Sequence, residues 1–223
     1  MIALRRPAPV VASIAATTFA LVICRLLDMH SAAFLAKLAA SSGFLLLAWT
    51  VGATATMYGR WLLAGLGLSW CGDLLLEGPG DNFFLAGLAS FLLAHLAYVA
   101  AFAGRGIEPT RAAAALLIVG SMSWGVAAWL EPWLPPSLAM PVHAYMVVIS
   151  VMAVTAIGTT GRGAPLLVPA GALLFYVSDL SVAAGQFMQP DFPNYVWGLP
   201  CYYAGQVLLA LSAQPRRSGA GSP

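Results

Sequence analysis

The chain contains about eight successive runs of roughly 20 predominantly apolar residues, which is the length that a helix needs to cross the hydrocarbon core of a bilayer. Of its 223 residues, 61% are hydrophobic and only 8% are charged, so a water-soluble globular fold is excluded. The runs are continuously apolar, whereas the strands of a membrane barrel alternate. The sequence therefore predicts an all-α, polytopic membrane protein. The expected helices span residues 8–27, 33–51, 58–76, 83–102, 111–130, 138–157, 165–188 and 195–213.

Basic residues predict the orientation, because they are retained on the cytoplasmic side when loops are short. The expected inner segments hold Arg5, Arg6, Arg60, Arg105, Arg111, Arg162, Arg216 and Arg217. The expected outer loops hold Asp28, Glu77, Asp81, Glu131 and Asp191. Both termini of this multi-pass protein should then be cytoplasmic, in an inner or plasma membrane. We expect residues 1–223 to form one integral membrane domain, with 214–223 as a flexible cytoplasmic tail. The net charge of +2 serves orientation and contact with lipid headgroups, so no nucleic-acid partner is expected.

Five ionisable residues interrupt the apolar runs, and such residues usually face the protein interior and carry function. They are Lys37, Asp73, His95, His143 and Asp179. Helix direction and rise place Asp73, Asp179 and Lys37 in the outer half of the membrane, at a level that Tyr202 also reaches. Separate burial would leave each charge uncompensated, so one shared polar cavity is expected there. The alternative is a Lys37–aspartate ion pair that only fixes helix packing, and His143 fits an interfacial histidine without a role as well as a functional one.

The pair of aspartates has a chemical use. Two carboxyl groups in a poorly hydrated pocket tend to take different protonation states, because desolvation and like-charge repulsion each disfavour a second negative charge. One carboxyl can then deliver a proton while the other stabilises a developing oxocarbenium ion, as cleavage of an ether or acetal-like bond requires. The chain has no Gly-x-Ser-x-Gly elbow, no His-Glu-x-x-His zinc motif and no phosphate-binding glycine loop.

Four short motifs carry a family resemblance. They are Ser69-Trp-Cys-Gly-Asp73-Leu-Leu-Leu, Phe91-Leu-Leu-Ala-His95-Leu-Ala-Tyr98, Gly171-Ala-Leu-Leu-Phe-Tyr-Val-Ser-Asp179 and Tyr202-Tyr-Ala-Gly-Gln206. In this order and on these helices, they resemble the YhhN family, whose characterised animal members are lysoplasmalogenases. Lys37 matches the family's lysine in the second helix, although Leu38 stands where the family commonly has proline.

The resemblance implies an eight-helix membrane enzyme that hydrolyses the vinyl-ether bond of lysoplasmalogen to a fatty aldehyde and a glycerophospho-base. Asp73 and Asp179 correspond to the aspartates proposed as catalytic in the family. We expect His95 to orient a carboxyl or relay a proton, and Lys37 with Tyr202 to hold the lipid phosphate or keep one aspartate ionised. Tyr98, Gln206 and His143 complete the expected substrate-binding set. Lysophospholipid substrate and membrane lipid are the expected partners, and neither a metal nor another cofactor is expected.

Two other functions are compatible with the same residues. In a zinc-dependent membrane lipid hydrolase, His95, His143, Asp73 and Asp179 would be ligands, since imidazole and carboxylate both bind zinc. In a proton-coupled transporter of lipids or small molecules, the aspartates would be ion sites. The sequence leaves homodimerisation open.

Overall fold

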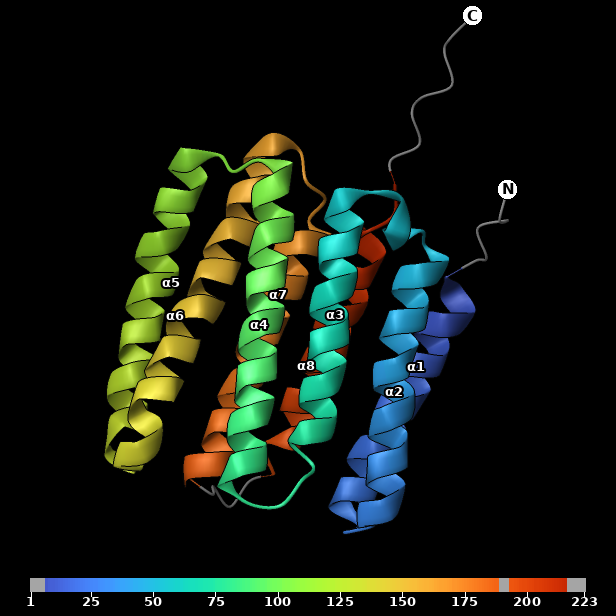
Figure 1. Ribbon diagram of the computed structural model, residues 1–223, viewed down its shortest axis with the longest axis vertical. Coiled ribbons are helices and arrows are strands. Elements are labelled where there is room, and N and C mark those ends of the chain that lie inside the picture. The colour runs from blue at the N-terminus through green and yellow to red at the C-terminus, as the bar shows by residue number, and fades with distance from the viewer. Residues whose placement is uncertain (1–6, 189–192, 216–223) are drawn as a thin grey trace, which may run out of the picture.

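Eight α-helices form the part of the chain that the computed structural model describes, residues 7–188 and 193–215 (Figure 1). They are α1 (Ala8–Leu26), α2 (His30–Thr50), α3 (Met57–Leu75), α4 (Asp81–Arg105), α5 (Pro109–Leu130), α6 (Pro136–Gly158), α7 (Leu167–Ala183) and α8 (Tyr195–Ser212). Short 3-10 helices follow α2, α5 and α6, at Ala53–Ala55, Glu131–Trp133 and Thr159–Arg162. Most helix ends lie within three residues of the predicted ones. The clear exception is α7, whose α-helical part stops at Ala183 and continues as a π-helical turn over Ala184–Met188.

The helices run alternately up and down, so that α1 begins and α8 ends at the same end of the bundle (Figure 1). The neighbouring pairs α1 with α2, α3 with α4, α5 with α6 and α7 with α8 pack along their lengths. Helix α8 also contacts α1, α2 and α3, so it lies inside the bundle rather than at its edge. The end of the bundle where α1 begins carries Arg60, Arg105, Arg111 and Arg162 together with Glu108, and the other end carries Asp28, Glu77, Asp81 and Glu131 together with Arg25. Arg5, Arg6, Asp191, Arg216, Arg217 and most of the expected tail lie outside the described residues.

Six of the eight described helices are long and apolar enough to cross a membrane, whereas the sequence predicts eight crossings. The two that fall short are α3 and α8. Their composition explains the difference, because α3 contains Arg60 and Asp73 and α8 contains Pro200, Gln206 and four aromatic residues among its 18 residues. Asp73 of α3 and Gln206 of α8 are buried against neighbouring helices, whereas Arg60, near the start of α3, is exposed.

Glycines set how closely the central helices approach. A Cβ atom on Gly205 of α8 would lie 2.8 Å from the backbone oxygen of Gly171 on α7, so this crossing is possible only without a side chain. A Cβ on Gly72 would lie 2.6 Å from the ring of Phe91, and this brings α3 against α4 next to Asp73. At the periphery, α5 directs large apolar side chains outward, including Leu117 and Trp124, which are 76% and 79% exposed. An apolar surface of this kind suits contact with lipid.

Candidate active site

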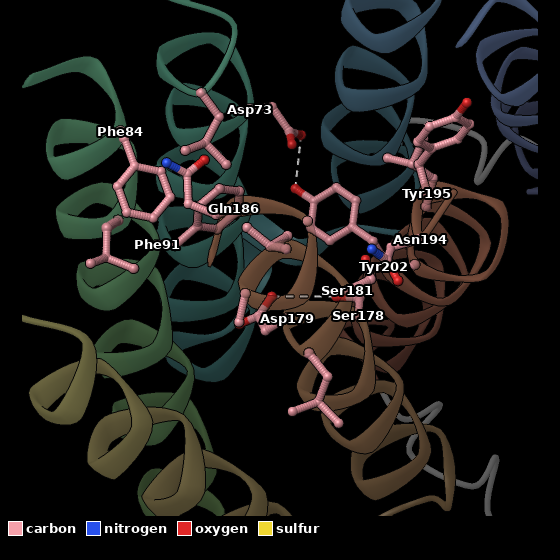
Figure 2. Close-up of a pocket in the computed structure, with 18 of the residues that line it drawn as sticks. Asp73, Phe84, Phe91, Ser178, Asp179, Ser181, Gln186, Asn194, Tyr195 and Tyr202 are labelled. Atoms are coloured by element: carbon pink, nitrogen blue, oxygen red, sulfur yellow. Dashed lines mark hydrogen bonds between the residues drawn. The ribbon is translucent and has the colours of Figure 1, made fainter. Parts of the chain in front are cut away.

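A cavity of about 670 Å³ opens near the acidic end of the bundle, and both Asp73 and Asp179 line it (Figure 2). Lys37 and Tyr202 line the same cavity, so the structure brings together the four residues that the sequence places at one level. Most of the remaining wall is apolar, and it includes Phe84, Leu88, Phe91, Leu130, Val142 and Ile149. An apolar cavity with a few convergent polar groups is the usual form of a small-ligand site.

The Asp73 carboxylate is held by two hydroxyl groups. Ser41 on α2 donates to its Oδ2 at 2.6 Å, and Tyr202 on α8 donates to the same oxygen at 2.8 Å. The Ser41 hydroxyl is itself 3.0 Å from the hydroxyl of Tyr203. Asp73 is only 4% exposed, so three helices fix its orientation in a site with little water. Hydroxyl donors on one oxygen stabilise a carboxylate in such surroundings.

Asp179 belongs to a separate group of polar residues on α4, α6 and α7. Tyr145 donates its hydroxyl proton to Oδ2 of Asp179 at 2.6 Å, and Nε2 of His95 lies 3.5 Å from the same oxygen. The ring nitrogen Nε2 of His95 is 2.8 Å from the Tyr145 oxygen. Because the Tyr145 hydroxyl donates its hydrogen bond to Asp179, its oxygen can accept a hydrogen bond from Nε2 of His95. The Ser178 hydroxyl, 3.4 Å from Oδ1, is a weaker contact (Figure 2).

Aromatic rings connect the two carboxylate groups. The ring of Phe175 packs against His95 at a centroid distance of 4.7 Å and against Tyr202 at 5.2 Å, both in edge-to-face geometry. Phe91 packs against Phe175 and Tyr202 at 6.0 Å each. Edge-to-face contacts at these distances stabilise a rigid wall. His95 and Tyr202, which hold the two aspartates from behind, are therefore fixed relative to each other through Phe175.

The partner of Lys37 differs from the expected one. Its Nζ lies 2.6 Å from Oε1 of Glu77, in the turn after α3, and Arg25 at the end of α1 forms an ion pair with the same oxygen. Partial burial by itself would raise the pKa of the Glu77 carboxyl, but Lys37 and then Arg25 outweigh that effect and lower it below its usual range. The expected alternative of an ion pair between Lys37 and an aspartate is thus replaced by a three-residue charged cluster at the same cavity.

Tyr98 and Gln206 are buried behind the cavity rather than in its lining. The Tyr98 hydroxyl donates to Oε1 of Gln206 at 2.9 Å and lies 3.4 Å from the Ser69 hydroxyl. A Cβ on Gly65 would meet the Tyr98 ring at 2.4 Å, so α3 packs directly on it. These two residues support the α3, α4 and α8 interface and are not part of the cavity lining, where substrate-binding residues are expected. His95 likewise is buried outside the lining and reaches the cavity only through Asp179 and Tyr145.

His143 lies away from the cavity, contrary to its expected role in substrate binding. Its Nε2 is 3.1 Å from Glu131 and its Nδ1 is 2.7 Å from the Ala139 carbonyl oxygen, and its side chain is 42% exposed. It lies near the start of α6, where its ring faces the Glu131 turn. The zinc set of two histidines and two aspartates is consequently not assembled. Among the described residues, no three His, Cys, Asp or Glu side chains are grouped as metal ligands would be.

Four residues that interact with the expected site were not singled out from the sequence. The sequence places Glu77 in an outer loop, and nothing in it distinguishes Arg25, Tyr145 or Ser41 from other residues of their kind. Spacing offered a sign for two of them. Glu77 follows Asp73 by four residues and Ser41 follows Lys37 by four, so each shares a helix face with a residue that was recognised.

The fold and the cavity together define a multi-pass helical membrane protein with two carboxylates in an otherwise largely apolar chamber. Comparison with known proteins identifies its relatives. The profile of the YhhN family matches residues 32–213, and the chain belongs to this family. No solved structure matches this chain.

Several curated relatives share about a third of their aligned residues with this chain. Lysoplasmalogenase TMEM86A of Bos taurus is 33% identical over 162 residues, which cover 70% of this chain and 66% of the relative. Lysoplasmalogenase of Mycobacterium tuberculosis is 35% identical over 158 residues, covering 67% of this chain and 59% of the relative. Human lysoplasmalogenase TMEM86B is 33% identical over 156 residues, covering 70% and 64%. The aligned region thus covers less than two thirds of the length of each of these relatives.

Proposed function

We propose that this protein is a lysoplasmalogenase, a membrane-embedded hydrolase that cleaves the vinyl-ether bond of lysoplasmalogen-type lysophospholipids to a fatty aldehyde and a glycerophospho-base. The observation that carries the proposal is the presence of Asp73 and Asp179 on one largely apolar cavity. The relatives named as lysoplasmalogenases support the choice of substrate. A single-chain lipid offers one apolar tail and one polar head, and the cavity offers an apolar wall and a charged cluster.

The first step is transfer of a proton from one carboxyl group to the β-carbon of the vinyl ether, which leaves an oxocarbenium ion. We assign the acid role to Asp179, because a hydrogen bond from Tyr145 connects it to His95, which can carry a proton. Asp73 is assigned to the other role, because Ser41 and Tyr202 both donate to its Oδ2 and fix the orientation of its carboxyl group at the cavity. An anion beside the oxocarbenium ion lowers the energy of the transition state that leads to it.

The second step is attack of water on the oxocarbenium carbon. The Asp73 carboxylate takes one proton from that water, and a hemiacetal forms. Asp73 then returns the proton to the departing glycerol oxygen while the hemiacetal hydroxyl gives its proton to the Asp179 carboxylate, and the C–O bond breaks to give aldehyde and alcohol. Both carboxyl groups end in their starting states, so the cycle needs only water.

The charged cluster and the apolar wall divide the substrate between them. Lys37 is placed to hold the lipid phosphate, while Tyr202 both lines the cavity and fixes Asp73. The alkyl chain lies against the apolar residues of α4, α5 and α6. This assignment keeps Lys37 and Tyr202 as substrate-binding residues and gives Tyr98 and Gln206 a supporting position.

The membrane arrangement is part of the proposal. All eight helices cross the bilayer of the cell membrane, with α3 and α8 sheltered by the other six, and the whole chain forms one membrane domain. The basic loops at the end where α1 begins and α8 ends support a cytoplasmic location for both termini. The cavity opens near the opposite, acidic end, so its position toward the outer half of the membrane follows from the same charge distribution.

The proposal is tested with purified full-length protein in detergent and two lysophospholipids that differ in one bond. The 1-O-alkenyl lipid carries the vinyl ether, and the 1-O-alkyl lipid of the same length and headgroup is its saturated control. Release of fatty aldehyde from the alkenyl lipid alone supports the proposal. Equal cleavage of both lipids, or no cleavage of either, contradicts it. Loss of activity after treatment with a chelator would support the zinc-dependent alternative.

A further inference from the structure

Two pairs of residues with the same spacing in sequence join α2 to α3 and to the turn that follows α3. Lys37 contacts Glu77 at 2.6 Å, and Ser41 contacts Asp73 at 2.6 Å. Four residues of α-helix rise about 6 Å. The charged pair therefore lies about one helical turn from the Asp73 carboxylate, further toward the end of the bundle and along the wall of the same cavity.

Arg25 makes the outer pair a cluster of two cations and one carboxylate. Both Arg25 and Lys37 meet the same oxygen, Oε1 of Glu77. Their backbones are held by α8, because Tyr195 donates to the Arg25 carbonyl oxygen at 3.3 Å and Tyr203 donates to the Lys37 carbonyl oxygen at 3.4 Å. The backbone at both cations is thus held to α8 by contacts that do not involve Glu77.

The cluster carries one more positive charge than negative charge. A single carboxylate oxygen serves both cations, whereas a phosphate group offers several oxygens to an arginine fork and a lysine at once. The three side chains are 27%, 10% and 17% exposed for Arg25, Lys37 and Glu77, so the cavity reaches them and bulk water only partly screens them. The arrangement has the form of an anion site that an internal carboxylate occupies.

The distance to Asp73 fits the shape of the substrate. In a lysoplasmalogen, the phosphate and the vinyl ether lie at opposite ends of a three-carbon glycerol. A separation of about one helical turn between the charged cluster and the Asp73 carboxylate is comparable with that glycerol unit. A phosphate at the cluster would accordingly leave the vinyl-ether carbons beside the inner carboxylate.

We propose that Arg25, Lys37 and Glu77 form a headgroup site in which the Glu77 carboxylate occupies the place of the lipid phosphate in the free protein and yields it when the lipid enters. This inference rests on the proposed function for its choice of lipid. Its new elements are the competing role of Glu77 and the contribution of Arg25, which precedes the family-matched residues 32–213. Glu77 sets the affinity and the specificity for phosphate-bearing lipids, because a lipid without a phosphate group cannot displace the Glu77 carboxylate from the two cations.

The test measures binding of saturated ether lipids to the full-length protein, so that no vinyl carbon is present and no turnover occurs. The probes are a 1-O-alkyl glycerol 3-phosphate, the matching 1-O-alkyl glycerol without phosphate, and free sn-glycerol 3-phosphate. Glu77→Gln should tighten binding of the phosphate lipid about tenfold, because the internal competitor loses its charge. Arg25→Gln should weaken it about tenfold, because one charge-assisted hydrogen bond is lost. Neither change should alter binding of the lipid without phosphate.

Matched controls lie outside the cavity. Glu131→Gln removes a carboxylate at the same end of the bundle, and Arg111→Gln removes a guanidinium at the other end that contacts Thr160 at 2.8 Å. Both should bind the phosphate lipid as the wild type does. If Glu77→Gln does not fold, Glu77→Asp replaces it, because the shorter side chain cannot reach both cations and should also tighten binding.

The direction of the Glu77 effect decides the outcome. Weaker or unchanged binding of the phosphate lipid in folded Glu77 variants overturns the proposal, because a structural ion pair would behave in that way. Equal binding of free glycerol 3-phosphate and the lipid overturns the assignment to a lipid headgroup. Since no hydrolysis is measured, failure of the lysoplasmalogenase proposal would leave a positive binding result standing.

Discussion

The hydroxyl of Tyr145 donates a hydrogen bond of 2.6 Å to Oδ2 of Asp179. The same hydroxyl is 2.8 Å from Nε2 of His95, so it stands between the proposed acid and the buried imidazole. Tyr145→Phe removes this link and keeps the ring. We expect kcat to fall about tenfold to a hundredfold with little change in KM, because the hydrogen bond acts on a charged group and not on the lipid. Steady-state assays of aldehyde release measure both constants.

Tyr58→Phe is the matched control for that experiment. The Tyr58 hydroxyl bonds to Ser212 at 2.7 Å near the other end of the bundle, outside the cavity of the aspartates. Its loss should leave turnover within about twofold of the wild type. An unaltered kcat in Tyr145→Phe, or equal losses in both variants, would contradict a specific role of Tyr145 at Asp179.

His95 is predicted to act by positioning Asp179 and supplying protons through Tyr145. His95→Phe keeps the packing against Phe175 but removes the donor, and it should lower kcat by about tenfold or more. His95→Gln keeps a donor on a flexible side chain and should recover part of that loss. Partial recovery in His95→Gln checks the role, because a loss of packing alone would not depend on the donor. Full activity of His95→Phe would remove His95 from the mechanism.

His143 should be dispensable for the reaction. Its contacts are Glu131 and its own helix, and its exposed ion pair contributes little to stability, about 1 kcal/mol or less. His143→Ala should therefore retain aldehyde release within about twofold and unfold at nearly the same temperature. A large loss of activity in a stable His143→Ala protein would show that the histidine reaches the substrate after all.

Helix positions follow from the sequence because each apolar run is long and its ends are marked by charged, glycine or proline residues. The exception at α7 has a local cause. Hydropathy cannot distinguish an α-helix from the π-helical turn at Ala184–Met188, since the two differ in hydrogen-bond spacing and not in composition. Asp73 and Asp179 are recognisable from the sequence, because a carboxylate within an apolar membrane helix usually faces the protein interior.

The contacts among the site residues were harder to predict, because they depend on where helices far apart in sequence touch. Glu77 looks like an ordinary loop residue until α1 and α2 bring Arg25 and Lys37 to the same carboxylate oxygen. His143 shows the opposite case. It has a polar ring in an apolar run, as His95 does, but the turn before α6 supplies a nearby partner in Glu131, and nothing in the spacing distinguishes the two histidines.

The crossing of α7 and α8 should be sensitive to a single methyl group. A Cβ on Gly205 would lie 2.8 Å from a backbone oxygen of Gly171 and 3.1 Å from the backbone nitrogen of Phe175, and backbone atoms cannot move aside cheaply. Gly205→Ala should lower the free energy of unfolding by about 1–3 kcal/mol. Gly125→Ala on α5, where no atom lies within 4 Å of the new methyl group, should instead be neutral or slightly stabilising. Thermal unfolding in detergent compares them, and equal melting temperatures would refute the close crossing.

The central claim is that Asp73 and Asp179 act on one bond inside one cavity. Asp73→Asn and Asp179→Asn keep side-chain size and remove the acid chemistry, with Asp81→Asn at the first residue of α4 as a control. We measure aldehyde released from the alkenyl lysophospholipid by each purified, folded protein. The account predicts losses of at least about a hundredfold in both single variants, nearly the same loss in the double variant, and full activity in the control. Turnover close to wild type in either single variant would contradict it.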